Sequence, residues 1–463
     1  MTQVSSVTHA ISINPATGEQ IGHYPFQSAS DLDAALARSA AGFSVWRRTP
    51  VEQRAQALVV LARTLRDNAA TMANMISVEM GKPVTQARGE IEKCAQLCEW
   101  YAEHGPAMLT AEPTLVEGGK ARIEYRPLGP ILAVMPWNFP IWQVLRGAVP
   151  ALIAGNTYVL KHAPNVMGSA YLLRDALQRA NFPEGVFEVI NVTPDGVSTA
   201  IADPRIAAVT LTGSVRAGMA IGAQAGAAMK KCVLELGGSD PFIVLNDADL
   251  DEAVKAAVIG RYQNTGQVCA AAKRLIVEQG IVEEFTRKFV EATRQLVVGD
   301  PLAADTYIGP MARFDLRDEL DQQVRDTLEE GATLLLGGKK AEGPGNYYEP
   351  TVFADVTDQM TSFKQELFGP VASIITARDA AHALALANDS EFGLASTIYT
   401  RNVELAQQMA GELETGGVFI NGYCASDPRV TFGGVKKSGF GRELSHFGVR
   451  EFCNAQTVWL DRR

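Results

Sequence analysis

One cysteine stands where its thiol could act as a nucleophile. Cys269 follows a glycine-bearing turn, Thr265 to Val268, and precedes a strand-like apolar run, Leu275 to Val277. A thiolate attacks electrophilic carbon, although most free cysteines simply pack as small hydrophobic residues. Catalysis by Cys269 therefore requires three helpers: an oxyanion donor, a base that activates water, and a group that accepts the electrons or the leaving group.

Asn138 and Glu235 are the candidates for the first two helpers. Asn138 lies in Pro136-Trp137-Asn138-Phe139-Pro140, where prolines and aromatics favour a dry, rigid loop from which an amide can donate to an oxyanion. Glu235 ends the strand-like run that starts at Lys231 and precedes two glycines, an apolar setting that raises a carboxylate pKa and suits a general base. A turn-forming asparagine and a salt-bridged glutamate are the structural alternatives.

Thr212-Gly213-Ser214 is a candidate phosphate-binding turn. It closes a predicted strand, 208–211, and opens a predicted helix, so its backbone N–H groups would face a phosphate-bearing ligand at the edge of an open α/β sheet. The chain contains no GxGxxG fingerprint, so a dinucleotide would be bound by a variant of the usual mode. Helix capping by Ser214 is the ordinary alternative.

Composition and charge argue against several classes of protein. The 463 residues, 47% hydrophobic, exceed the size at which one core usually stops growing, so we expect at least two domains. A net charge of -10 argues against the basic surface that nucleic acid or anionic membrane requires. Four prolines in the longest uncharged stretch, 127–145, argue against a membrane-spanning helix. Residues 1–20 lack a signal-peptide pattern, so the expected location is the cytoplasm.

The other cysteines and the six histidines indicate neither a disulfide framework nor a metal site. No CxxC spacing occurs, and the histidines are scattered. Cys94 and Cys98 share one helix face, but their neighbourhood offers no clear further ligands, so packing explains them. We expect no metal.

The remaining pattern predicts the α/β class. Thr49 is predicted to cap a helix that starts at Pro50, with Glu52 completing a capping box, and a second helix is predicted over 69–80. After Gly129, the predicted strands 131–135, 157–160, 186–190 and 208–211 alternate with helices 168–180 and 215–229, and strands 242–245, 275–277, 333–336, 372–376, 397–399 and 418–421 follow. Such alternation predicts parallel sheets covered by helices. The apolar run 457–460 predicts an edge strand at the chain end.

Taken together, these residues resemble the NAD(P)-dependent aldehyde dehydrogenase superfamily, from the opening Asn14-Pro15-Ala16-Thr17-Gly18-Glu19 to the C-terminal strand. The further matching elements are Lys161, Glu235-Leu236-Gly237-Gly238, Gly266-Gln267-Val268-Cys269, Glu366-Leu367-Phe368-Gly369-Pro370 and the glycine-rich segment 432–443. Each motif is weak alone, but their joint order is specific. The resemblance implies a Rossmann-type cofactor domain (1–111 and 128–237), an α/β catalytic domain (238–443) and a small β oligomerisation arm (112–127 and 444–463).

The resemblance also implies a mechanism. Cys269 would attack an aldehyde, while the amide of Asn138 and the backbone N–H of Cys269 would stabilise the oxyanion. Hydride would pass to a nicotinamide, and Glu235 would activate the water that hydrolyses the thioester. The presence of Glu235 favours hydrolysis over transfer of the acyl group to coenzyme A.

Residues carried over from the family pattern would hold the cofactor. Lys161 and Glu366 would hydrogen-bond the adenosine and nicotinamide riboses, and Ser214 would meet the pyrophosphate. The full predicted set is Pro136, Trp137, Lys161, Ala163, Pro164, Thr212, Gly213, Ser214, Leu236, Gly237, Glu366 and Phe368. Relatives commonly carry an acidic residue where Pro164 stands, and that residue binds the ribose 2'-hydroxyl. Without it, we expect NAD to be preferred and NADP to be usable.

Within the superfamily, the chain most resembles bacterial NAD(P)-using succinate semialdehyde dehydrogenases. A substrate with a distal carboxylate calls for a cation at the tunnel mouth, and Arg146 matches an arginine of that group, whereas Gln263 replaces a second one. Asp427 would either orient a cation or form a turn. The predicted substrate-binding set is Trp137, Arg146, Gln263, Ser426, Asp427 and Arg429. Another small or ω-carboxylated aldehyde is the alternative substrate.

Two other classes of function are possible from the same residues. A cysteine hydrolase would use the thiol, base and amide, but it would leave the nucleotide set unused, and thiol proteases rely on a histidine that no motif here supplies. A binding or structural protein has no need of Cys269, Glu235 and Asn138 together. The resemblance further implies a homodimer or homotetramer, joined through the strand regions 122–125 and 458–460, with no nucleic-acid or membrane partner.

Overall fold

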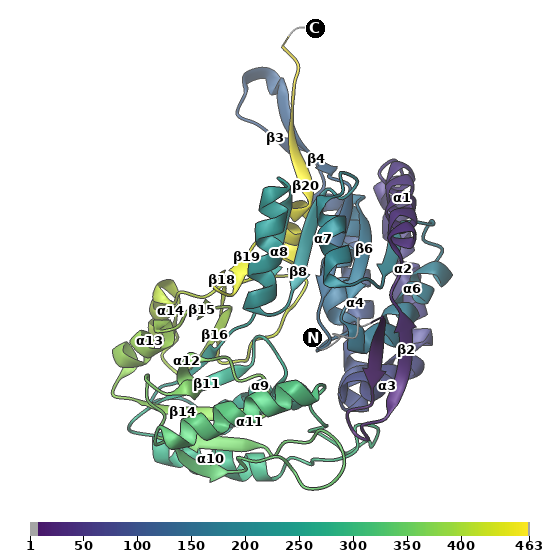
Figure 1. Ribbon diagram of the computed structural model, residues 1–463. Coiled ribbons are helices and arrows are strands. Elements are labelled where there is room, and N and C mark those ends of the chain that lie inside the picture. Colours follow the sequence, from purple (N-terminus) through teal and green to yellow (C-terminus); the bar gives the residue numbers. More distant parts are fainter. Residues whose placement is uncertain (1–7, 462–463) are drawn as a thin grey trace.

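Two large sheets form the body of the molecule, and a small sheet projects from it (Figure 1). The computed structural model describes residues 8–461; residues 1–7 and 462–463, which belong to the predicted cofactor domain and arm, lie outside the described residues. The first sheet contains, in spatial order, β19 (Gly439–Phe440), β9 (Lys231–Glu235), β8 (Ala208–Thr212), β5 (Pro130–Met135), β6 (Thr157–His162) and β7 (Phe187–Ile190). Strands β9 to β7 are parallel, as predicted, and β19 adds an antiparallel edge.

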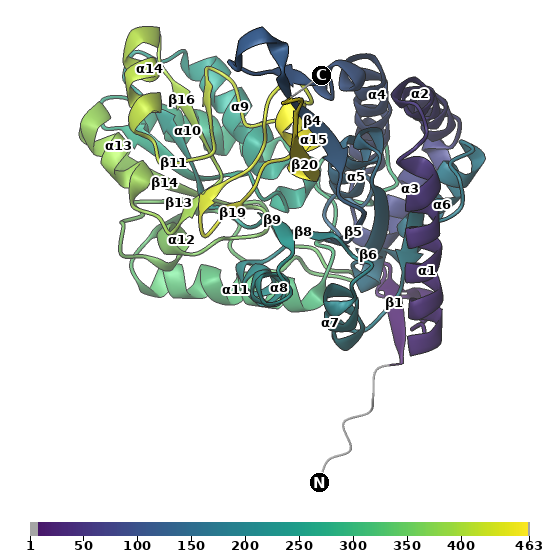
Figure 2. The same cartoon turned by 90° about the horizontal axis from the view of Figure 1, so that it is seen from above.

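Helices cover both faces of this first sheet (Figure 2). They are α1 (Ala29–Trp46), α2 (Val51–Asp67), α3 (Ala69–Met80), α4 (Val84–Met108), α5 (Trp142–Ala154), α6 (Met167–Arg179), α7 (Pro194–Ala202) and α8 (Val215–Ala227). Alternate residues of one strand enter different cores: Ile131 and Ala133 pack with α2 to α6, whereas Leu132 packs with α1, α7 and α8. Burial on both faces explains why these strands are continuously apolar.

The second sheet is also mainly parallel. Its spatial order is β12 (Thr333–Leu336), β13 (Thr351–Ala354), β14 (Val371–Ala377), β11 (Ala272–Glu278), β10 (Asp240–Val244), β16 (Ala395–Tyr399) and β17 (Gly417–Ile420). All neighbours are parallel except β12 with β13. The helices of this part are α9 (Leu250–Tyr262), α10 (Val282–Arg294), α11 (Phe314–Glu329), α12 (Thr361–Lys364), α13 (Ala380–Asn388) and α14 (Val403–Glu412).

The projecting sheet joins two distant segments of the chain. Strand β20 (Cys453–Trp459) runs antiparallel to β4 (Ala121–Pro127), which also pairs with β3 (Glu112–Pro113). The predicted strand over 457–460 therefore starts earlier, at Cys453. The shorter elements are β1 (His9–Ile13), β2 (Gln20–Pro25), β15 (Phe392–Gly393), β18 (Val435–Lys436), η1 (Glu117–Gly119), η2 (Pro164–Val166), η3 (Gln263–Gly266) and α15 (Ser445–Glu451).

One predicted helix start is wrong. Helix α2 begins at Val51, with Pro50 rather than Thr49 at its N-cap and no side-chain cap hydrogen bond. The hydroxyl of Thr49 instead donates to Val45 O (3.2 Å), and its backbone N–H donates to Trp46 O (3.1 Å). The last carbonyls of a helix have no partners in its regular hydrogen-bond pattern. Thr49 binds that of Trp46 and shares that of Val45 with Arg48 N.

Among residues 8–461, no helix combines the length and apolarity needed to cross a membrane. The same residues include no cluster of three or more His, Cys, Asp and Glu side chains placed to hold a metal ion.

Candidate active site

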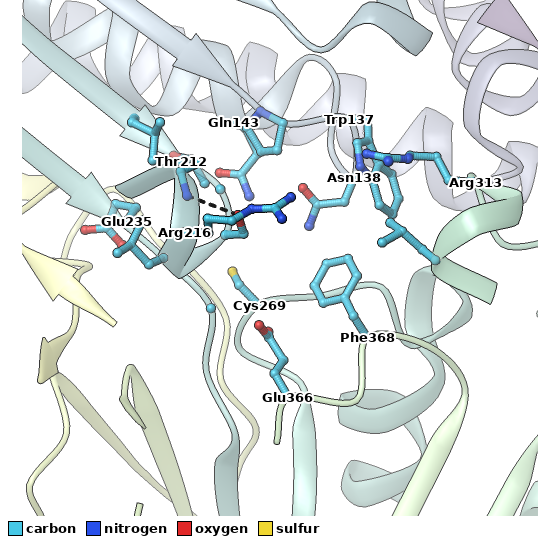
Figure 3. A pocket seen from close by; sticks show the side chains of 18 of the residues that line it. Trp137, Asn138, Gln143, Thr212, Arg216, Glu235, Cys269, Arg313, Glu366 and Phe368 are labelled. Atoms are coloured by element: carbon cyan, nitrogen blue, oxygen red, sulfur yellow. Dashed lines mark hydrogen bonds between the residues drawn. The ribbon is translucent and has the colours of Figure 1, made fainter. Parts of the chain in front are cut away.

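The predicted catalytic residues meet around one cavity of about 630 Å³ between the two large sheets (Figure 3). The first sheet contributes loops that follow the carboxyl ends of β5, β8 and β9. The second sheet contributes Cys269, which precedes β11, and Glu366 and Phe368, which precede β14. Open α/β sheets place ligands at the carboxyl ends of their strands, so the first sheet presents its binding edge to the nucleophile of the second.

A strained turn presents Cys269. Asn264 and Thr265 have φ values of 54° and 57°, in the left-handed region that asparagine tolerates and β-branched threonine avoids. Both are buried, and they are held by hydrogen bonds from Asn264 N to Gln86 Oε1 (2.8 Å) and from the Thr265 hydroxyl to Gly309 O (3.1 Å). Gly266 also has a positive φ, and a Cβ there would overlap the carbonyl of Gly369. Strain of this kind persists where the surroundings impose a geometry on a functional group.

A lysine that the sequence analysis missed connects this turn to Glu366. The buried ammonium of Lys273 donates to the carbonyls of Cys269 (2.6 Å) and Val268 (3.0 Å) and forms an ion pair with Glu366 (3.1 Å). Glu366 also accepts a hydrogen bond from Gly238 N (3.2 Å), and a Cβ on Gly237 would collide with its carboxylate. The absence of a side chain at Gly237 therefore allows Glu366 to approach the backbone.

The environment of Cys269 keeps its thiol protonated at neutral pH. Burial raises the pKa of Cys269 to about 11, while the positive charges of Arg146 and Lys273 act in the opposite direction. Only the thiolate is a strong nucleophile, so attack requires the thiol proton to leave. A second thiol, Cys424, lies on the wall of an adjoining cavity that Cys269 also lines.

Asn138 faces the sulfur of Cys269 across the cavity (Figure 3). Its side-chain nitrogen donates to Gln267 O (3.0 Å), and its backbone carbonyl accepts from the Asn264 side chain (2.7 Å). The side chain of Asn138, the candidate oxyanion donor, is thus hydrogen-bonded directly to the turn that carries Cys269. An amide nitrogen has two hydrogens, so the second remains to stabilise a developing oxyanion.

Two buried side chains hold the loop of Asn138. Nδ1 of His162 accepts from Ala163 N (2.9 Å), so Nε2 carries the proton and donates to Pro140 O (2.8 Å); burial lowers the pKa of His162 to about 4 and keeps it neutral. Glu90 accepts from the backbone N–H groups of Ile141 and Trp142 (both 2.9 Å), at the start of α5. A carboxylate at that position satisfies free amides and complements the helix dipole.

Glu235 is buried at the end of β9, between β8 and β19. Neither of its carboxylate oxygens has a hydrogen-bond partner among the described residues, and Figure 3 shows the carboxylate turned aside from Cys269. Burial, followed by the nearby negative charge of Glu443, raises the pKa of Glu235 above that of an ordinary glutamate. A raised pKa near working pH suits a general base.

The larger cavity fits a dinucleotide. The backbone at the start of α8 borders this cavity. Ser214 caps that helix by accepting a hydrogen bond from Ala217 N (3.3 Å) and also lines the cavity, so it has both of the roles considered for it. Two cations that the sequence analysis missed, Arg216 and Arg313, also line the cavity and could balance a diphosphate. Trp137 and Phe368 meet edge to face, with centroids 5.8 Å apart, near Cys269.

The predicted cofactor residues divide into two groups. Pro136, Trp137, Thr212, Gly213, Ser214, Leu236, Gly237, Glu366 and Phe368 line the larger cavity. Lys161, Ala163 and Pro164 do not line it; they lie at or just beyond the carboxyl end of β6, beside β5 on the same sheet edge.

A second cavity of about 330 Å³ also has Cys269 in its wall, and Gln143 likewise lines both cavities. Of the predicted substrate-binding residues, Arg146, Gln263 and Ser426 line the second cavity, whereas Trp137 lines the larger one. Arg146 is only 2% exposed, forms an ion pair with Glu443 and lies over the ring of Phe432 (4.6 Å). It lies deep in the molecule, and not at a tunnel mouth as predicted.

Asp427 and Arg429 lie outside both cavities. Arg429 is 74% exposed and its guanidinium binds Asp427 (2.7 and 2.8 Å). Asp427 thus has both of its predicted roles: it orients Arg429, and its carboxylate accepts from Arg429 N (2.9 Å) in a turn of this surface loop.

Known proteins resemble this chain in both sequence and structure. Residues 2–458 match the aldehyde dehydrogenase family, and the chain belongs to that family. The chain is 66% identical, over 99% of both lengths, to the NAD(P)+ succinate semialdehyde dehydrogenase Sad of Escherichia coli strain K12. It is 48% identical to an NADP+ succinate-semialdehyde dehydrogenase of Mycobacterium avium strain 104, over 97% of this chain and 96% of the relative.

A solved structure also resembles this chain closely. The crystal structure of succinic semialdehyde dehydrogenase from Streptococcus pyogenes, in complex with NADP+, superposes with a TM-score of 0.95 at 35% identity. The superposition covers 97% of this chain and 99% of that structure. The expected superfamily and α/β fold class are therefore confirmed.

Proposed function

We propose that this aldehyde dehydrogenase oxidises succinate semialdehyde to succinate with NAD or NADP. The observation that carries the proposal is the position of Cys269 between two cavities, one with the features of a dinucleotide site and one lined by cationic side chains. The names of the relatives support both the substrate and the cofactors. A cysteine hydrolase would have no use for the larger cavity.

The residues around Cys269 perform the first half of the reaction. The thiol of Cys269 passes its proton to solvent water in the cavity, and the thiolate that results attacks the aldehyde carbon. The charge on the oxyanion is stabilised by the amide of Asn138 and the backbone N–H of Cys269. A nicotinamide held beside Trp137 and Phe368 would supply the hydride acceptor that oxidation of the adduct to a thioester needs. Trp137 and Phe368 exclude water from that end of the cavity, and Glu366 is placed to hold a ribose.

The second half regenerates the thiol. Glu235 takes a proton from a water molecule, whose oxygen attacks the thioester carbon, and the carboxylic acid leaves Cys269 free. In the described conformation the carboxylate of Glu235 is turned aside, so this step requires rotation of its side chain towards Cys269. We propose that Arg146, Gln263 and Ser426 contact the substrate from the second cavity.

The proposed substrate is tested by a direct comparison of two aldehydes. Purified protein with NAD is expected to use succinate semialdehyde with a kcat/KM at least about tenfold above that for butanal, because a charge-assisted contact adds binding energy. Equal values for the two aldehydes would overturn the choice of substrate and leave the family membership untouched.

Replacing Asn138 with alanine is expected to lower kcat by about 10²- to 10³-fold, the usual effect of losing one oxyanion donor. Steady-state kinetics with succinate semialdehyde measures this fall, and fluorescence titration with NAD checks that cofactor affinity is retained. A kcat within threefold of the wild type, in a variant that still binds NAD, would remove Asn138 from the mechanism.

NAD is expected to be preferred and NADP to be usable. Pro164 stands where an acidic residue would repel a 2'-phosphate, and the nearby Lys161 is compatible with either cofactor. The measurement is kcat/KM for each cofactor at saturating aldehyde. No detectable turnover with NADP would contradict the expectation.

A homodimer or homotetramer completes the proposal. In the projecting sheet, β20 pairs on one side with β4 and is otherwise an edge among the described strands, where Trp459 and Leu460 are exposed. An exposed strand edge with apolar side chains favours pairing with a second copy. The three-domain division and a cytoplasmic location also remain predictions.

A further inference from the structure

One cation on the wall of the second cavity, Lys93, forms no ion pair within residues 8–461. The charged side chains on its wall are Glu90, Lys93 and Arg146. Glu90 forms an ion pair with Lys82, and Arg146 forms one with Glu443. Within residues 8–461, no carboxylate lies within ion-pair distance of Lys93.

Lys93 is held in place without being neutralised. It lies on α4, and its ammonium sits 4.0 Å from the centre of the Trp142 ring and donates to the hydroxyl of Ser426 (3.1 Å). Trp142 and Ser426 line the same cavity. An ammonium has three hydrogens, so one hydrogen bond leaves others for a ligand, and the aromatic face fixes the charge at the wall.

We infer that Lys93 is the specificity-determining cation that binds the distal carboxylate of the substrate, an inference that rests on the proposed function. Arg146 is a poorer candidate because Glu443 already neutralises it and it is only 2% exposed. Arg429 lies at the surface, paired with Asp427. Lys93 and Ser426 together offer a carboxylate two donors on the wall of the cavity that ends at Cys269.

The charge state of Lys93 gives this role a distinct pH signature. Burial lowers the pKa of Lys93 to about 8; Arg146 on α5 lowers it further, whereas Cys94, Asp427 and Glu90 raise it. As pH rises through this value, the free enzyme loses the ammonium and with it the charged contact. The ratio of kcat/KM for succinate semialdehyde to that for butanal is therefore expected to fall as pH rises through about 8. Titration of Glu235 or Cys269 affects both aldehydes and cancels in the ratio.

The experiment compares Lys93→Met, which keeps an unbranched apolar chain of similar length, with Lys93→Arg, which keeps the charge. We expect Lys93→Met to lower kcat/KM for succinate semialdehyde by about 10- to 100-fold, mainly through KM, and to change that for butanal by less than about twofold. Lys93→Arg should retain most of the selectivity and move its loss to higher pH, because a guanidinium stays charged. Arg88→Met, which removes an exposed cation from the same helix, is the matched control and should change neither value.

Two results would overturn the inference. One is a Lys93→Met enzyme that retains the wild-type preference for succinate semialdehyde; the other is an equal loss with both aldehydes, which indicates a structural role for Lys93. A wild-type enzyme without any preference would instead contradict the proposed substrate. The wild-type comparison therefore separates failure of the inference from failure of the proposed function.

Discussion

Replacing Cys269 with alanine is expected to abolish aldehyde oxidation, with a fall in kcat of at least about 10⁴-fold. The thiol is the group that forms the covalent adduct, and Asn138 and Lys273 both donate hydrogen bonds to the turn that carries it. Intact-protein mass spectrometry after incubation with aldehyde and NAD should show no acyl adduct. The variant should still bind NAD, because the larger cavity is lined mainly by other residues.

Cys232→Ala is the matched control for this experiment. Cys232 lies on β9 and lines neither cavity, so its loss should leave turnover within about twofold of the wild type. A Cys269→Ala enzyme with more than about a tenth of wild-type kcat would show that the thiol is not the nucleophile.

Replacing Glu235 with glutamine is expected to separate the two halves of the reaction. The amide fits the same space but cannot accept a proton from water, so hydrolysis of the thioester should slow by about 10²- to 10⁴-fold. Rapid mixing should show a burst of close to one reduced cofactor per active site, followed by very slow turnover. Mass spectrometry should then detect the acyl group on the peptide that contains Cys269.

The pH dependence follows from the raised pKa of Glu235. Only the carboxylate form acts as a base, and burial together with Glu443 favours the protonated form. Steady-state turnover of the wild type should therefore fall with decreasing pH at values well above the usual pKa of a glutamate, and the burst of reduced cofactor should not share that fall. A Glu235→Gln enzyme with no burst, or with the same acid limb as the wild type, would contradict this role.

Much of the fold is predictable from the sequence because the secondary structure that the local residue pattern favours is also the one that the tertiary packing requires. The helix predicted over 69–80 is observed over the same residues, and the strand centres after Gly129 coincide with observed strands to within about two residues. Buried parallel strands are short, apolar and bounded by turns, so their pattern is visible in one sequence. The start of α2 was missed because Thr49 bonds to the preceding helix, and a capping pattern cannot reveal that competition.

Some of the site residues could likewise be predicted from the sequence, and others could not. Cys269, Asn138 and Glu235 occupy motifs and come together as expected. Lys93, Lys273 and Arg216 lie in no recognised motif, and they matter because the fold brings their charges to the cavities or to Glu366. Arg429, chosen for its proximity in sequence to the glycine-rich segment, pairs with Asp427 at the surface instead. A position near a motif in the chain does not determine which way a loop presents its side chains.

The proposed reaction is the oxidation of succinate semialdehyde with a nicotinamide cofactor through Cys269. The most direct measurement follows the absorbance of the reduced cofactor while succinate is quantified in the same reaction. We expect one reduced cofactor for each succinate formed, with either NAD or NADP, and neither product from the Cys269→Ala enzyme. Succinate semialdehyde left unchanged, with no reduced cofactor from the wild type, would contradict it.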